Sequence, residues 1–426
     1  MHVDMNYDRG SLAINVAPDW RATVLRKPAM PVLADPSGAV AEALDAPLDA
    51  PGLREAAAAS KSACVLICDI TRPVPNGDIL PVVLRTLLAS GMPAEAITVL
   101  VATGLHRPNE GEELLELVGD RWVLDAVRVA NHFARRDEDH VEVGTTRRGN
   151  VIKLDRRFVE ADLRLAIGLV EPHFMAGYSG GRKIIAPGVA HADTITTFHS
   201  ARYMEDPNAA NCVLQDNPLH EDQLEVVRMV GGAYAINTVI DDERRMSFVN
   251  YGEIIASHLQ AVAFTRAYTE LPVPERYPTV VTSSAGYPLD KTYYQTVKGM
   301  VGPLDIMAPN GNLIVVSACS EGMGSPDYVA AQRRLIALGP DRFLASLLEK
   351  RHADVDEWQA EKQLAPMRAG TVSLYTTGLD DEERALTGVR MIESVEAAIT
   401  RSVVEHGDPR VAFVPEGPYI VPQYAP

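Results

Sequence analysis

The stretch from residue 171 to residue 190, EPHFMAGYSGGRKIIAPGVA, concentrates residues that can do chemistry. His173 lies near its start, and two consecutive glycines and an arginine precede Lys183. Glycines let a backbone approach a ligand closely. A lysine amine can hold a phosphate or form a covalent bond with a carbonyl cofactor or a substrate. A lysine that simply lies in solvent is the alternative interpretation.

A phosphate-binding loop is the first chemical interpretation of this stretch. The Walker A pattern requires G-x-x-x-x-G-K followed by Ser or Thr. Here Arg182 takes the position of the second glycine and Ile184 replaces the hydroxyl residue, so hydrolysis of a nucleoside triphosphate is disfavoured. Backbone N–H groups of Ser179, Gly180 and Gly181 could still cradle a single phosphate.

Four histidines lie in or near loops of this kind: His106 in TGLHRP, His173 in VEPHF, and His191 and His199 after the lysine. No pair has the HExxH spacing and no cysteine cluster accompanies them, so a conventional zinc site is not indicated. An isolated histidine is most often structural or exposed. His106 and His173 both follow apolar strands, however, and two histidines facing one pocket suit two-sided proton transfer.

Two further segments carry polar residues that could bind a carboxylate. Arg72, in CDITRP, could hold a carboxylate through two hydrogen bonds, or it could pair with Asp69 to brace the turn. Gln295 and Lys298, in DKTYYQTVKGM, lie three residues apart on an expected helix and therefore share a face. On its own, the second segment indicates no function.

Three buried strands are expected to position the first set of loops. They span residues 64–70, 96–104 and 163–170, with the sequences CVLICDI, AITVLVATG and LRLAIGLV. Strands that alternate with helices predict an α/β domain with a parallel sheet. Ligands bind beyond the carboxyl ends of the strands in such sheets. The loops DITRP, ATGLHRPN and GLVEPHFMAGYSGGRK are therefore expected to face one pocket.

The length of 426 residues predicts two domains. The Pro-rich stretch LPVPERYP, residues 271–278, is the expected boundary, and a second strand-loop-helix series follows it. We therefore expect two α/β domains with mainly parallel sheets, spanning residues 1–270 and 271–426, with the active site in the cleft between them. The last residues of the chain are a candidate for returning to the first domain.

The formal net charge of −17 argues against nucleic acid or an anionic membrane as a partner. The N-terminus lacks a basic region followed by an apolar run, and no stretch reaches the length of a membrane helix, so we expect a cytoplasmic protein. The cysteines do not resemble a disulfide framework. They are Cys64, Cys68, Cys212 and Cys319.

Taken together, the motifs DITRPVP, TGLHRPN, EPHFMAGYSGGRKIIAPGVA, TFHS and YYQTVKG, in this order, resemble the nickel-pincer-nucleotide-dependent lactate racemase family. The resemblance extends over nearly the whole chain, to past Trp358. Its most specific part is the EPHF…GxSGGRK stretch. An α/β fold and a 2-hydroxyacid racemase or epimerase activity are what this resemblance implies.

The resemblance also implies a cofactor, pyridinium-3,5-bisthiocarboxylic acid mononucleotide nickel. Lys183 would be its covalent anchor and His199 a nickel ligand, with His106 and His173 as the acid/base groups. The other implied residues fall into two sets. The cofactor-binding set is Asp69, Thr71, Ser179, Gly180, Gly181 and Arg182, of which residues 179–182 would contact the nucleotide phosphate, and the substrate-binding set is Arg72, Lys298, Gln295, Tyr294 and Trp358.

The implied reaction is redox-neutral inversion at C2 of a lactate-like acid, a malate-like acid or a sugar acid. Hydride moves to the cofactor, a 2-oxoacid forms, and hydride returns to the other face. The implied partners are the small 2-hydroxyacid and the enzymes that build the cofactor, and the protein would be a monomer or a homodimer. Two alternatives remain open: a pyridoxal-phosphate enzyme with Lys183 as its Schiff base, and a non-catalytic relative that binds a nucleotide or an anion.

Overall fold

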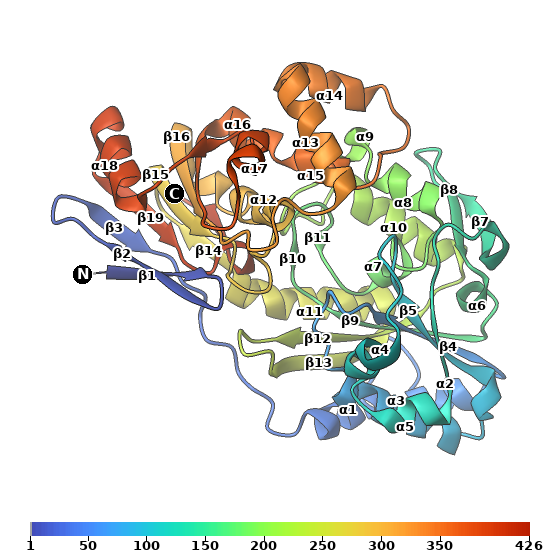
Figure 1. The fold of residues 1–426 in the computed structure, drawn as a ribbon. Coiled ribbons are helices and arrows are strands. Elements are labelled where there is room, and N and C mark those ends of the chain that lie inside the picture. Colours follow the sequence, from blue (N-terminus) through green and yellow to red (C-terminus); the bar gives the residue numbers. More distant parts are fainter. Residues whose placement is uncertain (1) are drawn as a thin grey trace. The chain divides into compact units, whose positions relative to one another are not determined.

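The computed structural model describes residues 2–426, and their contacts divide them into two compact units. The N-terminal unit comprises Ala29–Phe198 and Val213–Ala267. The C-terminal unit comprises the residues up to Pro28, His199–Cys212 and Tyr268–Pro426. Each unit contains one six-stranded sheet (Figure 1).

The sheet of the N-terminal unit has the strand order β13-β12-β9-β4-β5-β6. All neighbouring strands run parallel except the edge pair of β12 and β13, which is antiparallel. The strands are β4 (Ala63–Cys68), β5 (Ile97–Ala102), β6 (Arg128–Asn131), β9 (Leu163–Leu169), β12 (Tyr234–Ile240) and β13 (Met246–Glu253).

The core of this unit lies between the sheet and the helix that follows β4. That helix, α3 (Asn76–Ala89), buries Ile79, Val83 and Leu87 completely. These side chains belong to the same apolar cluster as β4 and β5, whose uninterrupted β-branched runs are typical of a strand covered on both faces. The burial of this apolar surface fixes where β4 and β5 end.

The remaining elements of the N-terminal unit are short helices and hairpins around the sheet. The helices are α1 (Pro36–Asp45), α2 (Leu53–Ala58), α4 (Gly111–Val118), α5 (Arg121–Ala126), α6 (Arg156–Val159), α7 (Arg182–Ile185), α8 (Ala192–Phe198), α10 (Pro218–Met229) and α11 (Ile254–Thr269). The hairpins are β7 (His140–Thr145) with β8 (Val151–Asp155), and β10 (Pro172–His173) with β11 (Gly177–Tyr178).

The sheet of the C-terminal unit is parallel throughout, with the order β18-β17-β16-β15-β19-β3. Its strands are β3 (Arg21–Val24), β15 (Tyr277–Ser283), β16 (Met307–Val316), β17 (Gly370–Tyr375), β18 (Arg390–Met391) and β19 (Arg410–Val414). Two strand pairs lie outside it: β1 (His2–Tyr7) with β2 (Gly10–Asn15), and β14 (Glu270–Val273) with β20 (Val421–Tyr424). The expected α/β fold with two mainly parallel sheets is confirmed.

Helices of the C-terminal unit connect and cover these strands. They are α9 (Ala201–Met204), α12 (Tyr293–Val301), α13 (Pro326–Leu338), α14 (Pro340–Leu348), α15 (Glu357–Lys362), α16 (Leu364–Ala369), α17 (Asp381–Leu386) and α18 (Val395–His406). Among residues 2–426, no helix is long and apolar enough to cross a membrane.

The division of the chain differs from the predicted boundaries in two ways. The residues up to Pro28 and residues 199–212 group with the C-terminal segment, because β3 pairs with β19 and α9 contacts α15. The stretch 271–278, expected as the domain boundary, contributes to β14 and β15, and the units change just before it, between Ala267 and Tyr268. The chain end, β20, pairs with β14 inside the C-terminal unit and does not return to the N-terminal unit.

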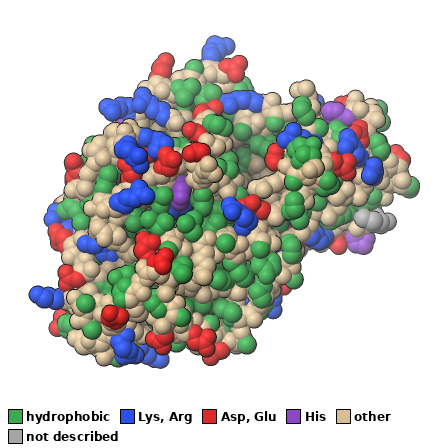
Figure 2. Space-filling model, turned by 180° about the vertical axis from the view of Figure 1, so that it is seen from behind, with side chains coloured by type: hydrophobic (Ala, Val, Ile, Leu, Met, Phe, Trp, Pro, Cys, Tyr) green, Lys and Arg blue, Asp and Glu red, His purple; other side chains and the backbone are tan. Residues whose placement is uncertain are grey.

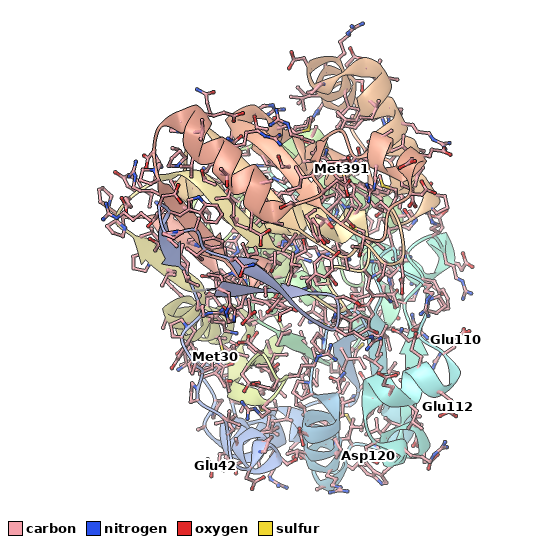
Figure 3. All side chains as sticks on the ribbon, turned by 60° about the vertical axis from the view of Figure 1, so that its left-hand side comes forward. Met30, Glu42, Glu110, Glu112, Asp120 and Met391 are labelled. Atoms are coloured by element: carbon pink, nitrogen blue, oxygen red, sulfur yellow. The ribbon has the colours of Figure 1, made fainter. Side chains whose placement is uncertain are left out.

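The acidic balance of the sequence is visible on the surface. Glu42 on α1 and Glu110 and Glu112 at the start of α4 are exposed and point outward (Figure 3). The face drawn in Figure 2 carries acidic and basic side chains close to one another, with hydrophobic side chains between them. Charged groups on this face are therefore mixed in sign.

Candidate functional site

Three neighbouring strands of the N-terminal unit end in loops that carry candidate residues. Asp69 follows β4, His106 follows β5 and His173 follows β9. In the sheet β4 lies between β5 and β9, and all three run parallel. Their carboxyl ends therefore meet at one edge, where ligands of open parallel sheets bind.

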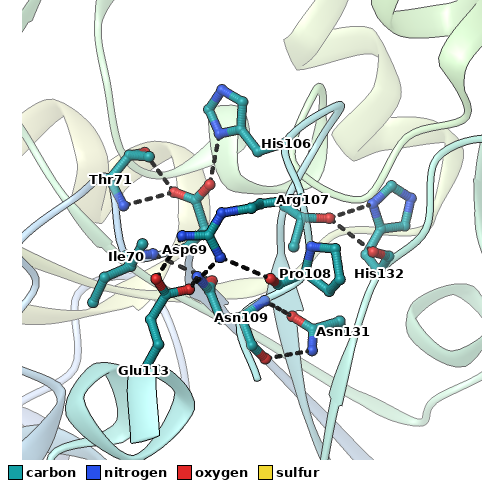
Figure 4. A network of polar contacts seen from close by, with 11 residues as sticks. Asp69, Ile70, Thr71, His106, Arg107, Pro108, Asn109, Glu113, Asn131 and His132 are labelled. Atoms are coloured by element: carbon teal, nitrogen blue, oxygen red, sulfur yellow. Dashed lines mark hydrogen bonds and ion pairs between the residues drawn. The ribbon is translucent and has the colours of Figure 1, made fainter. Parts of the chain in front are cut away.

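Asp69 and His106 form a tight pair at this edge (Figure 4), with His106 Nδ1 2.6 Å from Asp69 Oδ2. The hydroxyl of Thr71 donates to the other carboxylate oxygen of Asp69 at 2.5 Å. Burial alone would raise the pKa of Asp69, but the hydrogen bonds and the charge of its partners lower it. The carboxylate therefore stays ionised and favours a proton on His106 Nδ1, which leaves Nε2 as the basic nitrogen.

A second group of hydrogen bonds joins the loops that carry Asp69 and His106 (Figure 4). Asn109 accepts a hydrogen bond from the Ile70 N–H at 3.3 Å and exchanges two more with Asn131, of 3.0 Å and 2.8 Å. Glu113 binds Arg107 through both guanidinium nitrogens, at 2.7 Å and 2.6 Å, and also Asn109 at 2.5 Å. These contacts fix the two loops to each other.

The loop of His106 is also tied to the segment that follows Lys183. The His106 N–H donates to Thr103 O at 2.9 Å, and the Gly104 N–H donates to Gly188 O at 2.9 Å. The first bond closes the loop of His106 itself, and the second links this loop to the segment after Lys183.

His173 has a different environment from His106. Its side chain is buried, with 6% of the residue exposed, and it stacks on Phe174 with ring centroids 5.2 Å apart. Its Nδ1 accepts hydrogen bonds from the N–H groups of Met175 and Ala176, at 3.3 Å and 3.2 Å. An accepting Nδ1 carries no proton, so the neutral ring has its hydrogen on Nε2.

Arg72 pairs with Glu171 in the structure. The two side chains are partly exposed, at 29% and 24%. The alternative interpretation, a side-chain pair of Arg72 with Asp69, does not describe this geometry, although the Arg72 N–H does donate to Asp69 O at 3.1 Å. A guanidinium so placed can exchange one carboxylate for another.

Lys183 is partly buried at the start of α7, and its N–H donates to Gly180 O at 3.0 Å. Burial raises the pKa of the Cys68 thiol to about 11, while the charges of Arg72 and Lys183 act in the opposite direction. The Lys183 amine therefore lies within electrostatic reach of the end of β4.

The turn before Lys183 is packed closely against its own unit. Ser179 Oγ donates to Leu169 O at 2.7 Å. A side chain at Gly180 would approach Val170 Cγ2 to 2.6 Å, and one at Gly181 would approach His258 to 2.8 Å. Both glycines have positive φ, at +77° and +47°. In this structure they are required by the fold of the turn itself.

His191 is neither a surface residue nor exposed at the sheet edge. It is buried, its Nε2 lies 3.0 Å from Asp137 Oδ1, and its ring meets that of His140 edge-on at 5.0 Å. His140 in turn contacts His132 through the Nε2 atoms of both rings at 3.0 Å. The structure places His191 in a buried histidine cluster.

The remaining candidates belong to the C-terminal unit. The rings of His199 and Trp358 pack with centroids 4.5 Å apart, and Trp358 Nε1 donates to the Tyr294 hydroxyl at 3.3 Å. Gln359, the residue after Trp358, donates to Tyr294 O at 2.7 Å. The predicted residues His199, Trp358 and Tyr294 therefore form one group.

Gln295 and Lys298 lie on α12, which also carries Tyr294. The side-chain oxygen of Gln295 is buried and has no hydrogen-bond partner among residues 2–426. A buried acceptor without a partner costs free energy, so Gln295 is suited to receive a hydrogen bond from a ligand.

Sequence analysis missed Lys362, which holds the segment that carries His199. Its amine donates to Met204 O at 2.9 Å and to Ala209 O at 3.0 Å, and burial lowers its pKa. The signal was its spacing, because Lys362 follows Trp358 by one helical turn on α15.

The donor set of the protein can be compared with the implied nickel group. Among residues 2–426, no group of three or more His, Cys, Asp or Glu side chains is arranged to hold a metal ion. The imidazole of His199 is a donor type that suits nickel, and the Lys183 amine is a group that can bond covalently to a cofactor. The residues fit the implied group.

Comparison with known proteins identifies the family of this chain. Residues 7–211 match the lactate racemase N-terminal domain, and residues 275–421 match the lactate racemase C-terminal domain. The chain belongs to the lactate racemase family. It is 29% identical to the lactate racemase of Thermoanaerobacterium thermosaccharolyticum over 374 residues, which are 84% of each chain. It is 32% identical to the lactate racemase of Lactiplantibacillus plantarum over 289 residues, which are 68% of each.

Solved structures extend this membership to the fold. The lactate racemase apoprotein of T. thermosaccharolyticum superposes with a TM-score of 0.90 at 25% identity, covering 99% of this chain and 100% of that one. A Thermotoga maritima protein superposes with a TM-score of 0.62 at 17% identity, covering 88% and 98%, and shares the fold. The family resemblance predicted from the motifs is confirmed.

Proposed function

We propose that this member of the lactate racemase family inverts C2 of a 2-hydroxycarboxylic acid. The observation that supports this most directly is the pair of unequal histidines at one sheet edge. His106, backed by the Asp69 carboxylate, presents a basic nitrogen, whereas His173, with an accepting Nδ1, presents an N–H group. One can take the proton of the 2-hydroxyl and the other can donate to an oxygen.

In the proposed reaction, His106 removes the hydroxyl proton, and Asp69 stabilises the imidazolium that forms. His173 donates a hydrogen bond to the substrate oxygen through Nε2, and His106 returns the proton to the product oxygen, so both histidines end as they began. Where a substrate presents its hydroxyl to His173 instead, this ring would take and return the proton at Nε2, which requires its own hydrogen on Nδ1. The hydrogen bonds from Met175 and Ala176 would then be given up.

Lys183 and His199 are the residues proposed to hold a nickel-pincer nucleotide, and Asp69, Thr71 and the 179–182 turn are proposed to adjoin it. When bound, this group supplies the acceptor for the C2 hydrogen. The covalent bond to Lys183 would keep it in one orientation.

Arg72 and Lys298 are proposed to hold the substrate carboxylate, with Tyr294, Gln295 and Trp358 lining the rest of the site. Arg72 would exchange Glu171 for the substrate. The unpartnered oxygen of Gln295 would accept a hydrogen bond from a donor group of the bound ligand other than the hydroxyl that His106 deprotonates. Because its two curated relatives are named lactate racemase, lactate is the first substrate to test.

The first experiment is intact-protein mass spectrometry with nickel analysis, on protein co-produced with the cofactor-synthesis enzymes. The proposal expects a mass increment at Lys183 and near-stoichiometric nickel. An unmodified Lys183 without nickel, from a host shown to load a known lactate racemase, would overturn it.

A second experiment tests the reaction on the loaded enzyme with L-lactate deuterated at C2. Return of the same hydrogen predicts that D-lactate keeps the deuterium. Loss of the deuterium to water would indicate removal of C2 hydrogen as a proton, as in a pyridoxal-phosphate-type reaction. The histidine assignment fails if His106→Ala and His173→Ala variants both keep full activity.

A further inference from the structure

Arg182, the residue before Lys183, has a guanidinium that is directed into the N-terminal unit. Only 2% of the residue is exposed. Its Nε donates to His220 Nδ1 at 2.9 Å and its Nη2 donates to Ala176 O at 2.8 Å. Its Nη1 donates to Tyr178 O at 2.9 Å and lies 3.0 Å from His258 Nε2. We call Arg182, His220 and His258 the Arg182 cluster.

The Arg182 cluster contains a buried cation and neutral partners. No ion pair joins Arg182 to a carboxylate anywhere in residues 2–426. Burial, and then the charge of Arg182, lowers the pKa of His220 to about 3, and the same causes lower the pKa of His258. Both rings are therefore neutral, and His220 accepts a hydrogen bond from Arg182 through Nδ1. Burying a guanidinium without a neighbouring anion costs free energy. The hydrogen bonds of Arg182 must therefore contribute something to the fold that packing alone does not.

These bonds converge on the loop that leads to Lys183. Arg182 donates hydrogen bonds to two carbonyl oxygens of the loop, those of Ala176 and Tyr178. Asn217, which caps α10, donates to a third, Met175 O, at 2.8 Å. His220 lies on α10 and His258 lies on α11, so side chains from two helices hold the loop.

The histidine on α11 also touches the turn itself. His258 Nε2 lies 2.9 Å from Ser179 O, and its side chain occupies the space that a Cβ at Gly181 would need. A shift of His258 would therefore move the turn. Lys183 follows this turn directly on α7, and its charge acts on the Cys68 thiol at the end of β4.

We propose that Arg182 is a positioning residue, which fixes the 176–182 loop and so sets the direction of Lys183, and that it does not contact a nucleotide phosphate. Its hydrogen bonds to Tyr178, Ala176 and His220 engage three of its five N–H groups, and with only 2% of the residue exposed the guanidinium is withdrawn from the surface of the turn. Any phosphate at the turn would meet the backbone and Lys183. The proposal rests on the proposed function only where Lys183 is taken as the residue that carries the cofactor.

Matched variants of His220 test this without touching the loop. In His220→Asn, the amide oxygen occupies the place of Nδ1 and can accept from Arg182, whereas His220→Leu removes the acceptor. Amide hydrogen exchange of residues 174–183 is measured on the apoprotein. We expect wild-type exchange in His220→Asn and exchange faster by about five- to tenfold in His220→Leu, because one buried hydrogen bond is lost.

Loading of Lys183 is the second readout, by mass spectrometry after co-production with the cofactor-synthesis enzymes. We expect His220→Leu and Arg182→Met to load poorly and His220→Asn to load like the wild type. Normal exchange and loading in His220→Leu, with loading lost only in Arg182→Met, would overturn the proposal and make Arg182 a direct ligand. If His220→Leu fails to fold, the pair His258→Gln and His258→Leu gives the same comparison.

The two proposals fail in different ways. If wild-type protein never gains mass at Lys183, the proposed function fails, yet the exchange rates still report whether the Arg182 cluster holds the loop. If the wild type loads and exchange in all variants is equal, only the positioning role is overturned.

Discussion

The loops that carry His106 and His173 leave neighbouring parts of one sheet, but the two histidine side chains have different surroundings. The side chain of His106 is 63% exposed and shares a proton with the Asp69 carboxylate. His173 is buried and accepts from two backbone N–H groups. The first histidine therefore has a carboxylate as its partner, and the second has two backbone N–H donors.

This difference determines what each imidazole can do. His106 can take a second proton because Asp69 stabilises the resulting cation. A second proton on His173 would sit on Nδ1, facing two N–H groups, so His173 can become a cation only if the loop moves. The proton-transfer capacity of a histidine is thus set by its partners, and the following variants separate the two cases.

The largest effect is expected for His173→Asn. The Asn oxygen can still accept from Met175 and Ala176, but Nε2 is lost, so the rate of lactate racemisation by the loaded enzyme should fall by about 10²–10⁴-fold. His173→Ala should lose the same activity and also stability, by roughly 1–3 kcal/mol for each donor left unpaired. Urea unfolding of both apoproteins makes the comparison, and equal stability of the two variants would contradict the proposed hydrogen bonds.

The second effect concerns Asp69→Asn, which removes the charge behind His106. We expect racemisation to fall by about 10²-fold, less than for a fully buried triad carboxylate, because water already reaches His106. Loading of Lys183, measured by mass spectrometry, is the control for an intact protein. Unchanged activity at unchanged loading would show that Asp69 does not support the base.

The Arg182 cluster gives the stability of the protein a pH dependence. His220 has a folded pKa of about 3, below the 6.5 of the unfolded chain, so the unfolded state binds more protons between these values. Stability is therefore complete above pH 6.5 and is lost as the pH falls toward 3. His220 alone should lower the free energy of unfolding by about 2 kcal/mol between pH 7 and pH 5.

Urea unfolding of the apoprotein at the two pH values measures this loss. The His220→Asn variant has no imidazole at this position and should show a correspondingly smaller decrease. His106→Asn serves as the matched control from the exposed loop. An equal pH dependence in the wild type and His220→Asn would mean that His220 is not held neutral.

The sequence predicted the parts of this arrangement that depend on local pattern. Uninterrupted apolar runs identified β4, β5 and β9, and the residues after them fell at one sheet edge because parallel neighbours end together. The pairing of β3 with β19 was not predictable in this way, because it joins residues from opposite ends of the chain. The first residues and the 199–212 segment were therefore assigned to the other unit.

Side-chain partners at long separation were missed for a related reason. Arg182 bonds to histidines 38 and 76 residues away, and nothing in the local pattern of either helix marks them. The family resemblance predicted Lys183 as the covalent anchor and a phosphate contact for the 179–182 turn, and it gave no partner for the Arg182 side chain. Only the fold shows that the guanidinium is directed inward.

The smallest effect is expected for a substitution of Thr71, which tests how Asp69 supports His106. Thr71 is exposed, and its hydroxyl donates to the Asp69 oxygen that does not face His106. Thr71→Val should reduce lactate racemisation by only about two- to fivefold, because one exposed hydrogen bond is lost while the Asp69–His106 pair remains. Since that bond lowers the pKa of Asp69, the acid limb of the pH–rate profile should move to higher pH in Thr71→Val and stay in place in Thr71→Ser. A loss as large as that of Asp69→Asn would contradict the view that Thr71 acts mainly through Asp69.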